Sequence, residues 1–380
     1  MKRLPVRLAL LPLLATLLAG GARAADLTVT SLTVLPQPNV EPPYPQEAIQ
    51  MPFITHGNPK LAARINDRLF ISRFKTLAPA KAEPQLSAPE FDLAGLASQT
   101  FAVTRNDARL LTIHFHAESC GAYCETSSVA YSFDPQTGRL LNPRELFTPA
   151  GALALTQRMR KEKQRRYRAQ LSQTEKALKS ARKKKAADEK LADLEERISF
   201  NRACLDQLDQ DAEEPLSASS FNDRWEFKSG TAVWTDERCS NHAMRALDDV
   251  GNVSLSLSYP SLRPYLTAYG KRMLLGEGQA SSNDVFGQVL HGLIGESPVV
   301  MVLEKEDGDS VSGMYFDKNH RKPLLLSGEV TGAKLEMQEL DADGNPTANV
   351  RLEFGDNRLH GHWVGNTTLP MKLSAPSQAD

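Results

Sequence analysis

The chain has 380 residues, of which 41% are hydrophobic and 24% are charged, and its formal net charge is -1. A chain of this length can bury its own core. Beyond residue 24, no window offers the ~18 apolar residues that a membrane span needs. The near-neutral charge hides an asymmetry, because residues 156–199 contain fifteen Lys or Arg and seven Asp or Glu. That segment has a net charge of +8, and the rest of residues 25–380 has a net charge of -13. Such a charge asymmetry is informative about binding partners rather than about the fold.

The first 24 residues have the three parts of a secretory signal peptide. The chain starts with basic residues, an apolar stretch follows from Leu8 to Ala19, and Ala22-Arg23-Ala24 is a small-x-small cleavage site. Glycine stands where a lipoprotein signal needs its cysteine. We therefore expect cleavage after Ala24 and a soluble periplasmic protein of residues 25–380, without a transmembrane anchor.

Export bears on the cysteines, because paired thiols become disulfides in an oxidising compartment. Four cysteines allow three pairings. The pairs that the spacing favours are Cys120–Cys124 across a tight turn and Cys204–Cys239 across a longer loop. In a chain of this size such bridges are local staples rather than the main source of stability.

The chain up to residue 150 has the pattern of an α+β domain. Residues 58–77 form an amphipathic helix, with Asn58 as its cap, Pro59 at its first position, and apolar residues on one face. Three segments with period-two alternation follow and predict an antiparallel meander with one wet face. The apolar helix positions are Leu61, Ile65, Leu69 and Phe74; the strand segments are 98–107, 108–119 and 127–142.

A long segment rich in good helix formers is inserted at about residues 152–212. A single helix of this length would extend roughly 80 Å, too far for the chain to return to the strands after residue 220. We therefore expect a coiled-coil-like helical hairpin with its tip near Lys183 to Asp188.

The remaining chain is mostly strands. Residues 223–236 and 252–266 complete the first domain, 25–275, and a Gly/Ser-containing stretch at 276–297 is interpreted as a linker. Seven short strands between 298 and 374 predict a small antiparallel, barrel-like β domain, with a tail at 375–380. In its "RLHGHWVG", Trp363 is expected to pack in the core rather than to bind a metal or a sugar.

The stretch "LTIHFHAESCGAYC", residues 111–124, admits three interpretations. His114 and His116 share a strand face and could bind zinc with Cys120 or Cys124. A catalytic cysteine needs a free thiolate, which an oxidising compartment disfavours. The favoured interpretation is a disulfide-stapled hairpin with exposed histidines, and therefore no metal, cofactor or catalytic residue.

The basic part of the helical segment could bind an anionic polymer, although export argues against nucleic acid. The alternative is a solvated coiled coil whose charges serve solubility. The residues concerned are Arg160, Lys161, Lys163, Arg165, Arg166, Arg168, Arg182, Lys183, Lys184 and Lys185.

The middle of the chain resembles the RsiV-like extracellular domain of lysozyme-sensing anti-sigma factors and other envelope proteins. The likeness covers roughly residues 40–275 and is carried by the Ile65-Asn66 helix, "YSFDPQTGRLL", Leu146-Phe147 and the element from Tyr259 to Leu266. It implies an α+β domain with a binding role, and one member binds lysozyme. The chain departs from the family where Tyr123-Cys124 replaces a frequent histidine after Gly-Ala, and in the inserted helices. The C-terminal part resembles small β-rich envelope modules.

Three functions remain open from the sequence. The first is a non-enzymatic envelope binding protein for lysozyme, another muralytic protein or a cell-wall glycan; an acidic body suits a cationic lysozyme. The second is an enzyme acting on peptidoglycan or an envelope polysaccharide, and the third is a structural protein that oligomerises through the helical arm. A deep pocket with converging His and acidic residues would favour the enzyme, and a broad groove or exposed sheet would favour the binder.

Overall fold

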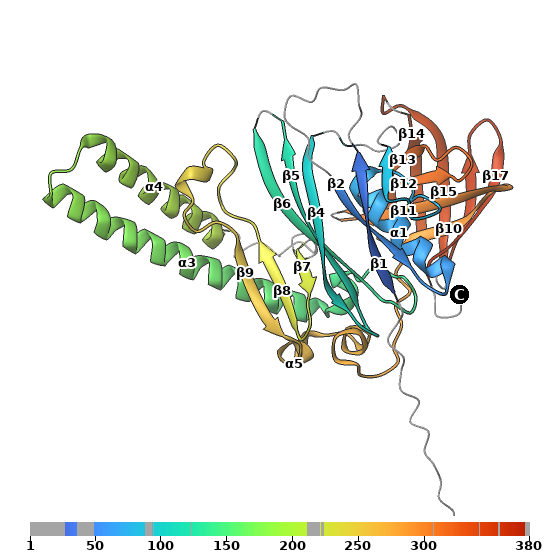
Figure 1. Ribbon diagram of the computed structural model, residues 1–380, viewed down its shortest axis with the longest axis horizontal. Helices are drawn as coiled ribbons and strands as arrows, with labels where there is room; N and C mark the ends of the chain where they lie inside the picture. Colours follow the sequence, from blue (N-terminus) through green and yellow to red (C-terminus); the bar gives the residue numbers. More distant parts are fainter. Residues whose placement is uncertain are drawn as a thin grey trace, which may run out of the picture.

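The computed structural model describes residues 27–35, 49–87, 93, 95–121, 123–210, 221, 224–306, 308–341, 343–355 and 358–376. Figure 1 shows a six-stranded sheet with a closed barrel on one side and, on the other, a three-stranded sheet with a long helical arm. The fold class is α+β, as predicted. The expected signal peptide, residues 1–24, and residues 377–380 of the expected tail lie outside the described residues.

The six-stranded sheet has the order β3-β1-β2-β4-β5-β6. The predicted meander forms its second half, and the ladder between its last two strands is unbroken from Leu111–Phe133 to Cys120–Cys124. Because side chains alternate between faces, apolar and polar residues of these strands separate onto opposite sides. The strands are β1 (Thr28–Leu35), β2 (Ile49–Thr55), β3 (Gln85–Ser87), β4 (Leu96–Asn106), β5 (Leu111–Cys120) and β6 (Cys124–Phe133).

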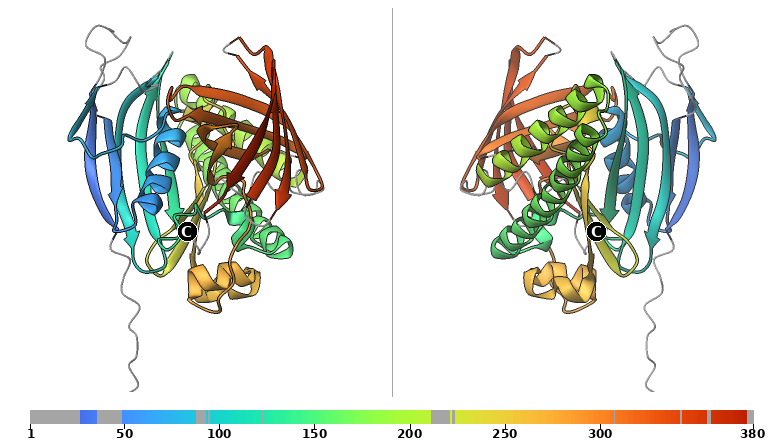
Figure 2. Two further views of the ribbon diagram at one scale, coloured as in Figure 1. Left: turned by 90° about the vertical axis from the view of Figure 1, so that its right-hand side faces the viewer. Right: turned by 90° about the vertical axis from the view of Figure 1, so that its left-hand side faces the viewer.

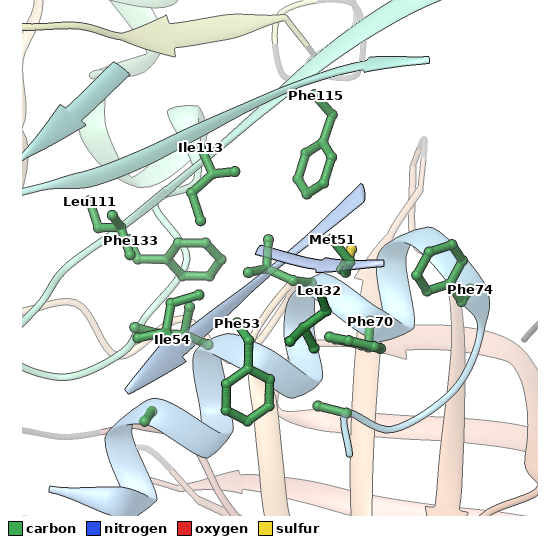
Figure 3. Packing of buried hydrophobic residues seen from close by; sticks show 14 of the residues in the cluster. Leu32, Met51, Phe53, Ile54, Phe70, Phe74, Leu111, Ile113, Phe115 and Phe133 are labelled. Atoms are coloured by element: carbon green, nitrogen blue, oxygen red, sulfur yellow. The ribbon is translucent and has the colours of Figure 1, made fainter. Parts of the chain in front are cut away.

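Helix α1 (Pro59–Phe74) covers the apolar face of this sheet. The predicted cap is correct, because the Asn58 side chain accepts hydrogen bonds from the N–H groups of Lys60 and Leu61. Phe115 and Phe133 of the sheet meet the helix in the core (Figure 3). The predicted apolar positions are all buried there: Leu61, Ile65, Leu69 and Phe74.

The same helix also contacts the barrel, so that it lies between the two β structures (Figure 2). Arg68 forms an ion pair of 2.7 Å with Glu304 of the barrel. The Arg321 guanidinium donates to the carbonyls of Leu77 and Ala78 at 2.9 and 2.8 Å. A second apolar cluster fills the interface: Ile71, Leu77, Val289, Val300, Val302 and Phe316.

Asp67 of α1 lies 3.8 Å from His291 of the barrel in this interface. Burial raises the pKa of Asp67 to about 6. Burial also lowers the pKa of His291 to about 3, with a further contribution from Lys318 and Arg64. Both side chains are therefore neutral between these values.

The C-terminal β domain is a closed antiparallel barrel of eight strands. Its first strand lies inside the 276–297 range that composition suggested as a linker. The strand was missed because Gly292 interrupts its alternating pattern. Glycine is needed there because β10 passes close to the neighbouring strand: a Cβ on residue 292 would lie 1.8 Å from the Lys372 carbonyl oxygen. The strands are β10 (Val289–Ile294), β11 (Ser297–Lys305), β12 (Ser310–Asp317), β13 (Pro323–Thr331), β14 (Lys334–Leu340), β15 (Pro346–Gly355), β16 (Arg358–Val364) and β17 (Thr368–Ser374).

The segment before β10 is held against the first domain. Arg139, which is almost fully buried, donates to the Asp284 carbonyl at 2.6 Å and to the Glu145 carboxylate at 2.8 Å. The Gln288 side chain exchanges two hydrogen bonds with the Leu140 backbone, of 2.9 and 3.1 Å. Residues 284–288 therefore act as a fixed connection rather than a free tether.

A buried carboxylate, Glu339, organises one part of the barrel interior. It accepts hydrogen bonds from the Tyr315 hydroxyl, from the Trp363 indole at 2.7 Å and from the Thr347 hydroxyl at 2.7 Å. Trp363 packs partly buried against the barrel core, as expected. The side chain of His362, on the same strand, is exposed.

A three-stranded sheet, β7 (Trp225–Phe227), β8 (Thr231–Asp236) and β9 (Val253–Ser258), packs on the face of the large sheet opposite α1. The Thr112 hydroxyl donates to the Phe227 carbonyl at 2.8 Å, and Arg105 donates to the Tyr259 hydroxyl at 2.8 Å. This part of the chain also contains short helical segments: α2 (Pro143–Leu146), η3 (Arg245–Leu247), α5 (Tyr259–Leu262), η4 (Arg263–Tyr265), α6 (Ala268–Gly270) and η5 (Lys271–Leu275).

The predicted helical hairpin is present as α3 (Pro149–Lys183) and α4 (Asp188–Gln210) (Figure 1). Its tip is at the predicted position although it lacks glycine, because Lys185 adopts the left-handed conformation with φ 52°. With 35 residues, α3 extends about 50 Å. Among the described residues, no helix is both long enough and apolar enough to cross a bilayer.

Candidate functional site

His114 does not have the environment that the sequence suggested. It was expected to be solvent-exposed, but its side chain is only 18% exposed because β7 covers this part of β5. Its Nδ1 lies 3.0 Å from Glu226 Oε1, and its ring stacks on that of His116 with centroids 4.3 Å apart. His116 is exposed and shares a hydrogen bond of 2.9 Å with the Ser128 hydroxyl.

The structure contains two disulfides, and they join the pairs that the spacing favours. Cys120–Cys124 closes the end of the β5–β6 hairpin, where the two residues face each other across the strands. Cys204–Cys239 joins α4 to the loop after β8. Among the described residues, no three His, Cys, Asp or Glu side chains gather as a metal site.

A groove of about 710 Å³ lies between the outer strand of the large sheet and the small sheet. One wall is β6 from Glu125 to Ala130, the floor includes residues of β7 and β8, and the other wall is the 237–252 loop. The residues that line it are mostly polar. They include His114, Glu125, Thr126, Ser128, Arg224, Glu226, Glu237, Arg238, Ser240, Asn241, His242, Arg245 and Asn252.

The two walls meet at one end of the groove. The Tyr123 ring stacks on that of His242, with centroids 3.3 Å apart. The Glu125 carboxylate lies 3.7 Å from His242 and 3.6 Å from Arg245. These contacts connect the stapled hairpin to the loop that follows β8.

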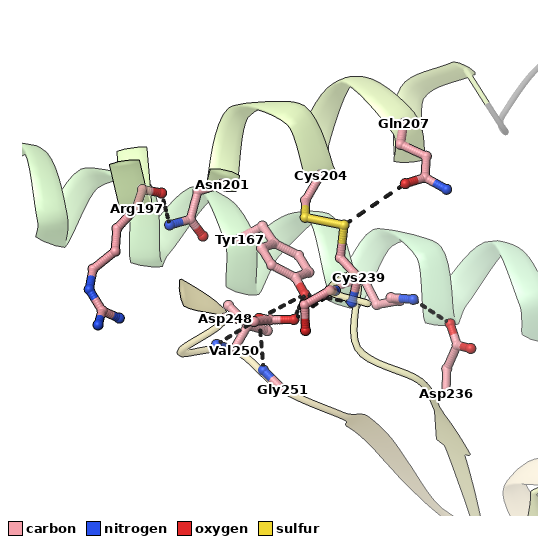
Figure 4. The surroundings of a disulfide bond; sticks show 12 residues. Tyr167, Arg197, Asn201, Cys204, Gln207, Asp236, Cys239, Asp248, Val250 and Gly251 are labelled. Carbon is pink, nitrogen blue, oxygen red and sulfur yellow. Dashed lines mark hydrogen bonds and ion pairs between the residues drawn. A yellow bond between two sulfur atoms is a disulfide. The ribbon is translucent and has the colours of Figure 1, made fainter. Parts of the chain in front are cut away.

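The loop wall is anchored to the base of the arm (Figure 4). Asp248, which is buried, accepts hydrogen bonds from the Tyr167 hydroxyl and from the N–H groups of Ser240, Val250 and Gly251. The N–H of Cys239 in turn donates to the Tyr167 hydroxyl at 3.0 Å. Burial, with the nearby Asp248 charge, raises the pKa of Tyr167, so this hydroxyl stays protonated.

The charges in the groove are mostly paired. Burial raises the pKa of Glu226, but hydrogen bonds from His114 and Lys228 outweigh it, and the net pKa is below the usual range. Glu226 is therefore ionised at neutral pH, and Glu237 pairs with Arg224. The guanidinium of Arg238 lines the groove without a hydrogen-bond or ion-pair partner among the described residues, whereas the Nε2 of His114 and the hydroxyl of Ser240 also lack a partner but are buried.

The chemistry of the groove includes a serine–histidine contact. Ser128 and His116 form a serine–histidine contact, but His116 stacks on His114 instead of bonding to an acid that would orient it. The Arg238 guanidinium can donate hydrogen bonds to a polar ligand. The sequence did not indicate Glu226, Arg238 or His242, although the nearby Cys239 offered a hint that this loop is held in place.

The basic residues of the arm do not converge on one site. Lys163 is buried and pairs with Asp236 at 2.8 Å. Arg165 and Arg166 both bind Glu162, whose pKa falls to about 2 because of their hydrogen bonds. The remaining residues are spread along the helix. Arg168 and Arg182 lie near acids, Arg160 has a partner, Lys161 is exposed, and the tip exposes Lys183, Lys184 and Lys185.

A second hollow, of about 780 Å³, follows the flank of the arm between α3 and α4. Two ion pairs cross between its helices, Arg182–Glu195 and Arg202–Glu175, both of 2.6 Å. Its apolar floor, with Leu178 and Ile198, is the ordinary seam of a two-helix hairpin. We therefore regard the groove beside β6 as the candidate site.

The architecture is that of an α+β domain joined to a closed barrel. No family model matches the sequence, and no curated protein matches it. Two solved structures of DUF3298 family proteins, a domain family without assigned function, resemble part of the chain. The protein from Bacteroides fragilis is 14% identical, with a TM-score of 0.35, and the protein from Pseudomonas aeruginosa is 13% identical, with a TM-score of 0.31. Each alignment covers 64% of this chain and 94% of the other. Likeness at this level does not bear on the groove.

Proposed function

We propose that this chain is an exported binding protein of the cell envelope that holds a protein ligand in the groove beside β6. The observation that carries the proposal is that each wall has its own disulfide. Cys120–Cys124 fixes the end of the β-hairpin wall, and Cys204–Cys239 ties the loop wall to α4. A site whose walls are fixed before binding loses less conformational entropy when the ligand arrives.

The two disulfides also support export, because such bridges persist in oxidising compartments. A periplasmic location and cleavage of the signal peptide after Ala24 belong to the proposal. They agree with the signal-like residues 1–24. Mass spectrometry of the protein recovered from the periplasm tests both points.

A protein ligand is favoured over a glycan by the aromatic residues near the groove. Sugars are commonly held on the open face of an aromatic ring, but Trp225 is only 4% exposed and stacks on Trp234 and Phe227. The Tyr123 ring, which is 57% exposed, stacks on His242 and is not among the residues that line the groove. The RsiV-like resemblance suggests lysozyme as the first ligand to test, and the acidic body of the chain would attract it.

Calorimetry at low and moderate salt tests the proposal, using residues 25–380 with a panel of lysozymes and soluble peptidoglycan fragments. At protein concentrations near 100 μM, even a complex with a dissociation constant of about 10 μM should be detected. Arg238→Glu changes the groove charge, and Arg358→Glu on the exposed side of β16 is the matched control. Although the acidic body attracts lysozyme from a distance, we expect Arg238→Glu to weaken saturable binding about tenfold because it removes the groove's hydrogen-bond donor that is unpaired among the described residues, and Arg358→Glu to leave binding within about twofold.

Two results would count against the proposal. If no lysozyme binds, lysozyme is not the ligand. If a ligand binds equally well to both charge variants, the groove is not the binding site. Binding of peptidoglycan fragments that Arg238→Glu abolishes would assign the groove to a glycan instead.

We also propose that the arm binds anionic polymers only at its tip. Lys183, Lys184 and Lys185 are exposed there, whereas Lys163 is buried in an ion pair. Replacing the three tip lysines by glutamine should abolish retention on a polyanion column at low salt. Unchanged retention would exclude the tip as the site.

A further inference from the structure

The large sheet has two edges of very different kinds. One edge, β3, has three residues, whereas the other edge, β6, has ten, Cys124–Phe133. Proteins usually protect long edge strands with proline, lysine or a bulge. The sequence of β6, CETSSVAYSF, has neither residue, and its ladder with β5 has no bulge. This edge therefore retains the ability to pair with another strand.

The register shows which backbone groups point to the free side. The N–H of Leu141 donates to the carbonyl of Ser132 at 2.7 Å, so this carbonyl points away from β5. Alternate residues of an antiparallel strand direct their N–H and C=O groups the same way. Thr126, Ser128 and Ala130 therefore present theirs on the free edge, and among the described residues these groups have no backbone partner.

The groove beside this edge has the size of one extended strand. A strand advances about 3.3 Å per residue and occupies about 4.8 Å by 10 Å in cross-section, or about 160 Å³ per residue. A volume of about 710 Å³ thus holds about four or five residues. The loop wall with Arg238 and His242 stands across the groove from β6. A second folded sheet would need space that this wall occupies, so the occupant is a single strand.

We infer that a partner protein adds an extended segment of about four or five residues to the free edge of β6, opposite Thr126–Ala130. The inference rests on the proposed binding function and specifies how the ligand is held. Backbone hydrogen bonds supply affinity in this mode and side-chain contacts supply selectivity. Since Arg238 is the groove cation without an ion-pair partner among the described residues, the segment carries an acidic side chain that reaches it.

A proline substitution separates edge pairing from the fold. Ser128→Pro removes one outward N–H, and proline is tolerated on an edge strand where the N–H faces away from the ladder. The matched control is Ser128→Ala, which keeps the N–H and removes only the hydroxyl that bonds His116. The probe is a library of random twelve-residue peptides displayed on phage and selected on residues 25–380.

We expect selected peptides to bind Ser128→Pro at least about tenfold more weakly than Ser128→Ala. In the wild type, bound peptide should slow hydrogen exchange at the amides of Thr126, Ser128 and Ala130. This second measurement does not depend on the variant folding. Selected peptides should also be enriched in Asp or Glu, and Arg238→Glu should reverse that preference.

Three results would overturn the inference: no peptide enrichment, equal binding to Ser128→Pro, or unchanged exchange along β6. The proposed function fails separately. If lysozyme or another envelope ligand binds and Arg238→Glu weakens it while Ser128→Pro does not, the groove is a binding site and strand addition is wrong. If selected peptides pair with β6 but no envelope ligand binds, the edge is competent and the proposed class of ligand is wrong.

Discussion

Removing each disulfide in turn provides a quantitative test of how the groove is held. Cys204 and Cys239 are 35 residues apart, whereas Cys120 and Cys124 are 4 apart. In the chain-entropy description, a disulfide stabilises by restricting the unfolded chain, and the effect grows with the logarithm of the closed loop. The two loops correspond to about 4 kcal/mol and about 2 kcal/mol at 25 °C.

The perturbations are the double substitutions Cys204→Ala with Cys239→Ala, and Cys120→Ala with Cys124→Ala. Alanine is suitable because Cys204 and Cys120 are both buried and polar replacements would add a cost of their own. We expect the first pair to lower the free energy of unfolding by about twice as much as the second. Each pair should also weaken ligand binding, because one groove wall is released.

Urea unfolding followed by tryptophan fluorescence is the appropriate assay. Trp225 and Trp234 lie in the three-stranded sheet from which the Cys239 loop emerges, so they report on this region. The reasoning is refuted if loss of the short-loop disulfide costs as much as loss of the long-loop disulfide. It is also refuted if neither loss changes binding of a ligand that Arg238→Glu weakens.

Two further predictions concern the barrel and its interface with α1. Glu339→Ala leaves buried donors in the barrel without their acceptor and should lower the unfolding free energy by about 3 kcal/mol. Glu336, on the same strand, is exposed, and Glu336→Ala should change the unfolding free energy by less than about 0.5 kcal/mol. Urea titration measures both values, and equal effects would contradict the buried network. Asp67 has a raised pKa in the folded protein, so its contribution to stability falls as the pH rises from about 4 to 6. His291 has a lowered pKa, so its contribution to stability increases as the pH rises from about 3 to 6.5. These two dependences oppose each other. Asp67→Asn should therefore make the unfolding free energy rise more steeply between pH 4 and 6, by up to about 1.4 kcal/mol per pH unit relative to the wild type. If the urea midpoints of the two proteins change with pH in the same way across this range, the pair does not titrate as described.

Much of the fold could be predicted because its signals are local. The cap at Asn58, the alternation in residues 98–142 and the helix formers after residue 149 each fix an element from neighbouring residues. The hairpin followed from chain length, since a straight helix could not return. The strand β10 was missed because Gly292 interrupts its pattern, and the need for glycine arises only where β10 closes the barrel against β17.

The candidate site could not be predicted in the same way, because its two walls come from separate parts of the chain. The alternation in β5 correctly placed His114 on the polar face of the sheet, and such a face is ordinarily exposed to solvent. Here the small sheet packs on that face, so His114 meets Glu226, which lies more than a hundred residues later and on the far side of the arm. No pattern near His114 encodes that contact.

The cysteines are where local and distant information meet. Cys120 and Cys124 are a local signal, and they fix the hairpin end that forms one wall. Cys239 is bonded to the arm at Cys204, and the same loop receives the Tyr167–Asp248 hydrogen bonds, so the base of the arm positions the opposite wall. The inserted arm thus separates the walls in the sequence and supports one of them in space. It follows that shortening the arm beyond Gln170 and before Arg197, whose side chains both bond to Asp249 of the loop wall, should spare the groove, whereas loss of the helical base should open it.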